Sequence, residues 1–436
     1  MESFAILKIA LALIVVIITI TLLIKRHESR MVLFTSGVVL CIIAGAPMDA
    51  LEAFTKAIKK ANIIEPIVAA MGFAYVLKLT TCDKHLVHAL SKILKYAGIF
   101  LVPGAVLITA FINISVTSAA GCSAAVGAVI IPLLMRMGVH PALAASTVLL
   151  GTYGSANLNP GYHQTNIVAE VSKVNVMEVI HYEAFYFGVS AVICAFGLMI
   201  VGLLLKEYKG YVLEDESNDD KDFKINPIKA IVPIVPVAIL LVLSNSHFKE
   251  WYEATFALKV PKVGIGHAMI IGSLLAFITC FKDVKAGEVM KKFCAGMGEG
   301  FSHVYGIIIC AGIFVAGLEA MGFVQQLIDF MKSNPNIATF IGSVGTFALA
   351  LITGSGDAAG IAFNQAVTIK AADIGIDPMH LGSVVTAVAG LGRSMSPIAG
   401  AAIICATYAK VNPIELAKRN AIPTIIAAIV YVLIAI

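Results

Sequence analysis

The sequence carries little charge, and this scarcity excludes an ordinary water-soluble protein. Only 13% of its 436 residues are Asp, Glu, Lys or Arg, whereas soluble domains carry about 25%. So few charges do not cover the surface of a water-soluble body of this size, and lipid must therefore cover part of it. The net charge is only +4, and no basic face is available for nucleic-acid binding outside the short loops.

Patterns typical of metal, redox and hydrolytic chemistry are also missing. The eight cysteines are scattered, most of them in apolar runs, and no CxxC pair occurs, which argues against a disulfide framework or a cysteine metal site. The sequence has no HExxH, Walker or GxSxG pattern. We therefore expect no enzyme and no cofactor, apart from Na⁺ or H⁺ as a coupling ion.

What the sequence has instead is a series of apolar runs long enough to cross a membrane. Hydrophobic residues make up 59% of the chain and the mean hydropathy is +0.92, and a crossing helix needs about 20 residues. The first run, Met1–Leu23, exceeds the apolar core of a cleaved signal peptide. We expect an all-α integral membrane protein of about ten crossings, at 4–24, 31–47, 63–80, 141–170, 181–205, 229–244, 264–281, 301–318, 379–408 and 420–436.

Two further apolar stretches, 97–135 and 337–371, are too long for one crossing and have polar residues near the middle. Backbone at membrane depth must be paired internally or line a cavity within the protein. Each stretch is therefore predicted to be a re-entrant hairpin whose tip stops halfway, the alternative being two ordinary helices with a polar packing face. The predicted tips are Asn113, Ser115, Thr117 and Ser118 in the first, and Thr353, Gly354, Ser355, Gly356 and Asp357 in the second.

The two halves of the chain match each other at one ungapped offset. A shift of 237 positions places Gly138 on Gly375 and Pro160 on Pro397. The same shift places Lys-Val-Asn at 173–175 on Lys-Val-Asn at 410–412. Because the matches follow one another in order along each half, they indicate an internal repeat.

The repeat predicts two units of opposite orientation, 1–205 and 229–436, joined by a hydrophilic linker at 206–228. Each half has five crossings and one hairpin, and because five is odd the second half enters the membrane inverted, a recurring plan of secondary transporters. The expected parts are scaffold helices at 1–80 and 229–318, hairpins at 97–135 and 337–371, and broken helices at 141–170 and 379–408.

The basic loops set the expected orientation. Most loop Lys and Arg residues fall on one side, which the positive-inside rule assigns to the cytoplasm. Both termini then lie outside the cytoplasm, and we expect the protein in the inner membrane. The amphipathic stretch 49–62, whose shifted partner is 286–299, is predicted to be an interfacial helix.

Each predicted broken helix has glycines and a proline near its middle, from Gly151 to Pro160 and from Gly390 to Pro397. Glycine and proline weaken a helix, and the freed amides and helix N-termini favour a small anion such as a carboxylate. With the hairpin tips, the residues predicted to bind substrate here are Asn157, Asn159, Gly392, Arg393, Ser394, Ser396 and Pro397.

Arg393 is the only arginine inside a predicted crossing. A charge at that depth costs about 2.5–3.5 kcal/mol or more and needs a partner. A substrate carboxylate held by the guanidinium fork is one candidate, and a permanent pair with Asp357 is the other. For the coupling ion, the hairpin tips offer oxygen ligands for Na⁺, and Ser155, His163 and Asp357 are candidate ion or proton residues. His163 as a packed polar residue is the alternative.

The stretches Leu391–Gly400 and Asn113–Gly121 resemble the anaerobic four-carbon dicarboxylate carriers of the DcuC type, within the ion transporter superfamily, and the resemblance extends over nearly the whole chain. It implies an elevator mechanism, a homodimer, and fumarate, succinate, malate or aspartate as substrates, moved by exchange or with a cation. Both tips lack the Ser-Asn-Thr triplet of the divalent-anion symporters, so the coupling ion stays open.

Other functions remain as alternatives. One alternative is a carrier of another small organic anion, such as a monocarboxylate or citrate. Another is a Na⁺/H⁺ antiporter. Arg393 favours an anionic substrate over cation exchange alone. A membrane enzyme or channel is disfavoured, because few acid, base or metal residues fall within the predicted crossings.

Overall fold

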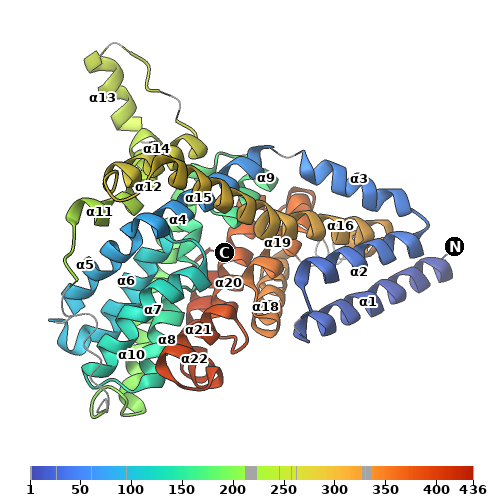
Figure 1. Ribbon diagram of the computed structural model, residues 1–436. Helices are drawn as coiled ribbons and strands as arrows, with labels where there is room; N and C mark the ends of the chain where they lie inside the picture. Colours follow the sequence, from blue (N-terminus) through green and yellow to red (C-terminus); the bar gives the residue numbers. More distant parts are fainter. Residues whose placement is uncertain are drawn as a thin grey trace.

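The computed structural model is built from helices, and no strand occurs in the residues that it describes (Figure 1). Those residues are 2–25, 27–59, 61–94, 96–211, 223–244, 246–256, 258–261, 263–326, 329 and 335–435. Residues 212–222 of the predicted linker at 206–228 lie outside them. All eight cysteines are free thiols, six of them buried.

The first half of the chain folds into helices at or near the predicted apolar runs. Lipid offers no hydrogen-bond partners to the backbone, and a helix pairs its N–H and C=O groups within one segment. The elements are α1 Glu2–Ile24, α2 Ser29–Ala44, α3 Pro47–Ile58, α4 Ala61–Thr80, α5 Cys82–Leu94, η1 Gly98–Phe100, α6 Leu101–Ser115, α7 Ala119–Arg136, α8 Pro141–Gly151, η2 Ser155–Leu158, α9 His163–Ser172 and α10 Val176–Leu204.

The second half has a similar succession of helices, and short 3₁₀ and π segments join some of them. Its elements are α11 Pro227–Ile231, η3 Val232–Ile234, α12 Val235–Ser244, α13 Ser246–Phe256, α14 Ile265–Ile278, α15 Ala286–Glu299, η4 Gly300–Tyr305, α16 Gly306–Ala320, α18 Pro335–Thr353, α19 Gly356–Ala366, η5 Thr368–Ile374, α20 Pro378–Ser394, α21 Gly400–Ala409 and α22 Pro413–Ala435.

The offset of 237 positions also relates the bounds of the helices in the two halves. α9 and α21 begin and end 237 positions apart, and α8 and α20 each begin at a proline at that spacing. Lys173 and Lys410, which follow α9 and α21, both adopt the left-handed conformation, with φ of 57° and 54°. The repeated sequence therefore specifies the same local starts and stops in both halves.

Five helices of the described part are long and apolar enough to cross a membrane, or six if one pair bent by 73° counts as a single span. Among them are 98–115 and 119–136, the two arms of the first predicted hairpin, so the re-entrant course of that hairpin stays a prediction. Shorter apolar helices cover further predicted crossings, including those at 31–47, 229–244 and 264–281.

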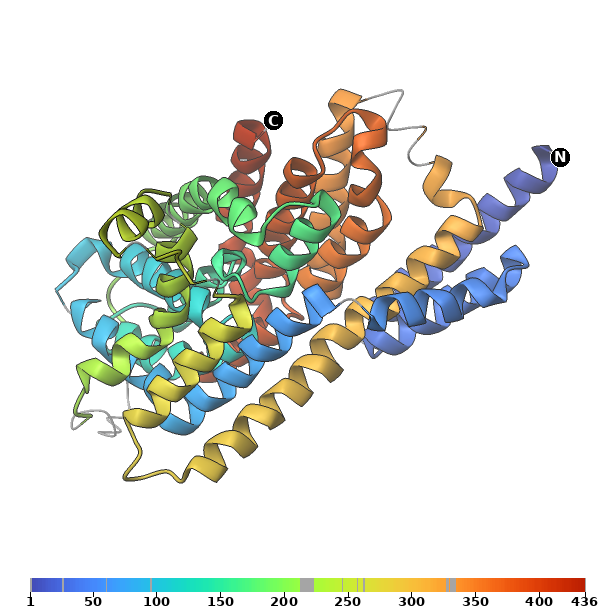
Figure 2. The same cartoon turned by 90° about the horizontal axis from the view of Figure 1, so that it is seen from above.

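α15 and α16 form one continuous helix, where the sequence analysis treats 286–299 and 301–318 as separate segments. Residues 286–320 run as a single helix of 35 residues through the π-helical η4. Gly296 allows close packing on α4, because a Cβ added there would lie 2.5 Å from the carbonyl oxygen of Met71. Figure 2 shows the long helix crossing the molecule beside α4.

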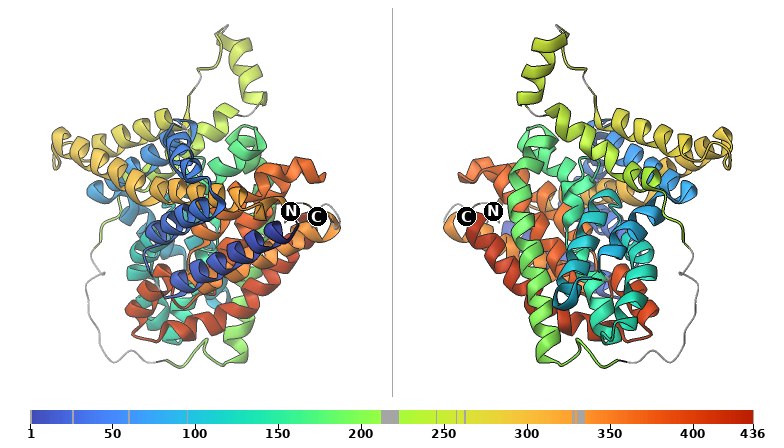
Figure 3. Two further views of the ribbon diagram at one scale, coloured as in Figure 1. Left: turned by 90° about the vertical axis from the view of Figure 1, so that its right-hand side faces the viewer. Right: turned by 90° about the vertical axis from the view of Figure 1, so that its left-hand side faces the viewer.

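The helices gather into two main packed regions. α16 packs along α2 and α3 on one side, where the N-terminus lies. On the other side, α6–α10 pack with α20–α22 around the largest hydrophobic core. Figure 3 shows α10 upright on this flank, against the C-terminal helix α22. The predicted broken helices and hairpins lie in this second region or along its border.

Candidate functional site

Both predicted broken helices are interrupted where the glycines and prolines occur. In the first, α8 ends at Gly151 and α9 begins at His163, with η2 between them. Gly154 has φ of +151°, a conformation that L side chains rarely adopt. In the second, α20 ends at Ser394 and α21 begins at Gly400. Each break leaves a helix C-terminus and a helix N-terminus inside the protein.

The two predicted tips are short turns between antiparallel helices, and a serine begins the second helix of each. Ser118 Oγ accepts a hydrogen bond from the Gly121 amide, and Ser355 Oγ accepts one from the Ala358 amide, both at 3.1 Å. These serines, 237 positions apart, are the N-caps of α7 and α19. Their hydroxyls therefore stabilise the helix starts by accepting one hydrogen bond each, which leaves each O–H group as a donor for another partner.

The breaks and the tips meet at a narrow polar cavity of about 20 Å³, room for about one water molecule. Six predicted site residues line it: Asn113, Thr117, Asn157, Gly356, Asp357 and Arg393. Eight further residues complete its wall: Ala119, Thr152, Gly154, Ala156, Tyr162, Gln164, Thr386 and Gly390. Residues separated by more than 200 positions in the chain therefore face one cavity.

Arg393 enters this cavity from the C-terminal end of α20. Its Nη2 donates a hydrogen bond to the carbonyl oxygen of Thr152, at the end of α8. Its Nη1 is buried and has no hydrogen-bond partner. Among the ion pairs of the described residues none joins Arg393 to Asp357, so the guanidinium group retains an unused donor.

Asp357 is engaged by the first broken helix. Tyr162 Oη donates to Asp357 Oδ1 at 2.8 Å. His163 Nε2 lies 3.2 Å from the same oxygen, close enough for charge pairing but outside hydrogen-bond geometry. The carboxyl group is 42% exposed and sits in the first turn of α19, where the helix dipole favours a negative charge. His163 thus contacts the carboxyl group of Asp357.

Several predicted residues hold the broken helix against the first tip. Ser155 Oγ donates to Asn113 Oδ1 at 3.1 Å, and Asn113 Nδ2 donates to the carbonyl oxygen of Val116. Asn159 Nδ2 donates to the carbonyl oxygen of Ile114 at 2.7 Å. These amides position the cavity wall, and only Asn113 among them lines the cavity itself.

The remaining predicted residues lie near the cavity without lining it. Gly392 allows a close approach, because an added Cβ would lie 2.4 Å from the carbonyl oxygen of Phe347. Ser394 Oγ donates back to Gly390 within α20, whereas Ser396 Oγ is buried without a partner. The others outside the lining are Ser115, Ser118, Ser155, Asn159, His163, Thr353, Gly354, Ser355 and Pro397.

The structure adds residues that the sequence analysis did not select. Gln164 Nε2 donates to the carbonyl oxygens of Gly356 and Asp357, both at 3.3 Å. Thr386 and Gly390 precede Arg393 by seven and three residues on α20, so the three share one helix face. Counting three and seven residues back from Arg393 along the predicted helix would have identified both residues.

Two acceptor oxygens in the cavity wall have no partner. They are Asn157 Oδ1 and Gln164 Oε1, both buried. Within the described residues, no group of three or more His, Cys, Asp or Glu side chains has the geometry of a metal site. Amide oxygens such as these suit a hard monovalent cation better than a transition metal.

A second arginine, Arg419, lies in a helix of spanning length. Arg419, in α22, is 8% exposed. Its guanidinium group donates to both carboxylate oxygens of Glu207 and to Glu415. Arg419 falls just outside the crossing predicted at 420–436, whereas α22 begins at Pro413. Because its charge is fully paired, Arg419 has a structural role.

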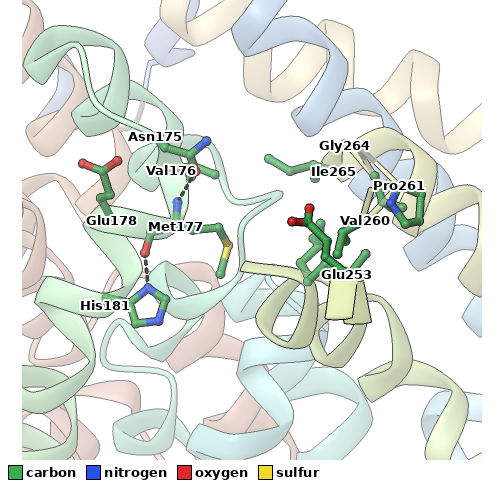
Figure 4. A pocket seen from close by; sticks show the side chains of 13 residues that line it. Asn175, Val176, Met177, Glu178, His181, Glu253, Val260, Pro261, Gly264 and Ile265 are labelled. Carbon is green, nitrogen blue, oxygen red and sulfur yellow. Dashed lines mark hydrogen bonds between the residues drawn. The ribbon is translucent and has the colours of Figure 1, made fainter. Parts of the chain in front are cut away.

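A larger cavity of about 680 Å³ lies elsewhere, between the start of α10 and the segment that precedes α14. Figure 4 shows Asn175 and Met177 on one side of it and Val260 and Pro261 on the other. No predicted substrate residue lines this cavity. We assign the candidate site to the small cavity, because three buried polar atoms without partners belong to residues that line it: Asn157 Oδ1, Gln164 Oε1 and Arg393 Nη1.

Comparisons with known proteins agree on a transporter. Residues 7–436 match the family described as DcuC, C4-dicarboxylate anaerobic carrier. An uncharacterized transporter of Haemophilus influenzae is 34% identical over 280 residues, covering 63% of this chain and 98% of that protein. The anaerobic C4-dicarboxylate transporter DcuC of Escherichia coli K12 is 24% identical over 375 residues, covering 84% of this chain and 78% of that protein.

A solved structure supports the same kind of fold. The YdaH transporter of Alcanivorax borkumensis superposes with a TM-score of 0.57, covering 88% of this chain and 86% of the other. The sequence identity is 11%, so this likeness concerns the fold alone.

Proposed function

The chain belongs to the C4-dicarboxylate anaerobic carrier family, whose members are transporters and not enzymes, and from this premise we propose that it carries four-carbon dicarboxylates across the inner membrane. The proposed substrates are succinate, fumarate, malate and aspartate. The observation that carries the proposal is the buried Nη1 of Arg393, which has no partner in a cavity formed by two helix breaks.

One substrate carboxylate binds the free donor edge of Arg393. A guanidinium fork matches a carboxylate in two parallel hydrogen bonds, and such charged bonds are about twice as strong as neutral ones. The second carboxylate lies at the start of α7, where Thr117 and Ala119 line the cavity. The N-terminus of a helix carries about half a positive charge, which favours an anion.

Loading requires the cavity to widen, because about 20 Å³ does not hold a four-carbon diacid. The turns at 116–118 and 354–355 are the natural moving parts, since each joins two helices through only a few residues. In the proposed elevator mechanism the two hairpins and the two broken helices move together against the scaffold helices. The inverted repeat gives the inward-open and outward-open states related geometries.

The coupling ion binds beside the substrate. Asn157 Oδ1 and Gln164 Oε1 offer unpaired oxygens for Na⁺. Alternatively, His163 and Asp357, 3.2 Å apart, exchange a proton. We also propose a homodimer formed by the scaffold.

Uptake of labelled succinate by purified protein in liposomes tests the function. We expect succinate to enter and unlabelled fumarate, malate and aspartate to compete, while lactate and citrate do not. Competition by lactate or citrate alone would indicate another small organic anion. No succinate uptake under any Na⁺, H⁺ or counter-substrate gradient, together with Na⁺-driven proton movement, would replace the proposal with a cation antiporter.

A further inference from the structure

Glu183 is a buried carboxyl group outside the candidate site. It lies in α10 with 0% exposure, and neither of its carboxyl oxygens has a hydrogen-bond partner. It falls on the buried stripe of α10, between Val179 and Phe187. It is not among the predicted site residues, because it comes only two residues into the predicted crossing at 181–205.

The groups around Glu183 are hydroxyls. Ser383 of α20 lies beside the carboxyl group, and Tyr431 of α22 is a near neighbour. Both hydroxyl oxygens are buried and have no hydrogen-bond partner of their own. A carboxyl group and two hydroxyls without other partners thus meet where α10 packs on α20 and α22.

No cation balances a charge on Glu183. The titratable side chains close to it are Tyr182 of α10 and Tyr431 of α22. Among the ion pairs of the described residues none includes Glu183. Two further tyrosines, Tyr153 and Tyr186, lie around Tyr431, and His380 of α20 is hydrogen-bonded to Tyr182 Oη.

An ionised carboxylate in such surroundings is too costly to persist. A buried charge without a partner or a hydrogen bond neutralises in preference to remaining charged. Glu183 therefore holds a proton in this conformation. A neutral carboxylic acid also fits the neighbouring hydroxyls, because it can both donate and accept a hydrogen bond.

The carboxyl group is linked to the candidate site through α20 and through the first break. Ser383 precedes Thr386 by three residues on α20, and Thr386 lines the cavity. One turn after Glu183, the carbonyl oxygen of Phe187 accepts a hydrogen bond from Tyr153 Oη at 2.7 Å. Tyr153 adjoins Thr152, the residue that accepts a bond from Arg393.

We propose that Glu183 is a proton-binding residue that couples proton movement to transport. The proton binds to a carboxylate oxygen, forming an O–H bond, while α10 is closed on α20. It leaves to water when the two helices separate and solvent reaches the group. The inference rests on the proposed transport function and adds a proton site to it that is separate from the substrate cavity.

Glu183→Gln tests the proposal, since glutamine keeps the shape of a neutral carboxyl group and cannot release a proton. In liposomes, we expect the variant to retain exchange of labelled for unlabelled succinate but to lose accumulation driven by a pH gradient. Glu178→Gln is the matched control, because Glu178 lies five residues earlier on α10 and is exposed. The control should accumulate succinate as the parent does. Accumulation by Glu183→Gln that follows the pH gradient as in the parent overturns the proposal.

Infrared spectroscopy of the parent protein provides a reading independent of transport and of variant folding. We expect the carbonyl band of a protonated carboxyl group at neutral pH, present in Glu178→Gln and absent in Glu183→Gln. If Glu183→Gln also loses exchange, the band of the parent protein tests the proton site instead. A parent without the band at neutral pH overturns the proposal. A band that is present at neutral pH and disappears when the pH is raised supports it. If the parent carries no succinate, the proposed function fails while the band still tests the proton site.

Discussion

Arg393 is the residue on which substrate binding depends most directly. Losing one partner of a buried, hydrogen-bonded charge pair costs about 2–5 kcal/mol. We therefore predict that Arg393→Ala abolishes measurable succinate binding. Arg393→Lys keeps the charge but not the fork, and should weaken binding by at least about tenfold, or about 1.4 kcal/mol. Isothermal titration with succinate measures both.

Arg136→Gln is the matched control for this prediction. Arg136 ends α7 and is exposed, so its substitution removes an arginine without touching the cavity. It should bind succinate as the parent does. Normal binding by Arg393→Ala would remove Arg393 from the site.

Tyr162 is predicted to keep Asp357 away from Arg393. Tyr162→Phe deletes the hydroxyl that donates to Asp357 at 2.8 Å, a bond of about 0.5–1.5 kcal/mol. The freed carboxylate then competes with substrate for the guanidinium, and the dissociation constant of succinate should rise by about two- to tenfold. The double variant Tyr162→Phe with Asp357→Asn should bind more tightly than Tyr162→Phe alone. Equal affinities in the two variants would contradict this role.

At the residue scale, the sequence predicted the kind of chemistry at the site better than it predicted the contacts of the side chains. Arg393, Asp357 and Asn157 were selected because polar groups at membrane depth are rare, and the structure brings all three to one cavity. The partners of Asp357 could not be predicted, since Tyr162 lies 195 positions away in the chain. Tertiary packing alone determines that distance.

At the scale of elements, the two helix ends at Lys173 and Lys410 provide a test of the repeated local structure. Both residues adopt left-handed conformations that strain a residue with a Cβ. Replacing either by glycine should raise the free energy of unfolding by up to about 1 kcal/mol. Thermal unfolding in detergent measures the shift, and similar gains at both positions are expected.

Lys418→Gly serves as the opposite control. Lys418 lies inside α22 and is exposed, where glycine costs about 1 kcal/mol relative to a good helix former. The melting temperature of Lys418→Gly should therefore be lower than that of the parent protein. A fall for Lys173→Gly and Lys410→Gly as well would argue against the left-handed helix ends.

The contact of α20 with the first break is predicted to tolerate no side chain at Gly390. An added Cβ there would lie 2.4 Å from the carbonyl oxygen of Tyr153, so Gly390→Ala must displace the break that carries Thr152. We expect succinate transport to fall by more than about tenfold, a loss of about 1.4 kcal/mol or more. Gly188→Ala in α10 meets nothing within 4 Å and should transport normally. Unchanged transport by Gly390→Ala would show that this contact is dispensable.

Element boundaries were the part of the fold that the sequence predicted best. Glycine and proline at the breaks, and serine at the tips, specify local conformations that need no distant partner. The continuity of α15 with α16 was not foreseen, because Gly296 and Gly300 suit both a joint and a close contact. Only the packing on Met71 of α4 decides between them.

At the scale of the whole molecule, composition alone predicted a membrane protein, and the family and the fold agree with a transporter. Composition could not predict how the helices are arranged. Hydropathy cannot distinguish a re-entrant arm from a crossing helix when both are apolar and of similar length, as in α6 and α7. Opposite orientation of the two halves and an elevator motion are therefore proposals about the molecule as a whole.

A structure of the protein determined with succinate bound would show whether the substrate occupies the cavity at Arg393. We predict density for the ligand between Arg393 and the start of α7, with the small cavity widened and Nη1 of Arg393 hydrogen-bonded to a carboxylate. Succinate in the large cavity of Figure 4, with both helix breaks unmoved, would contradict it.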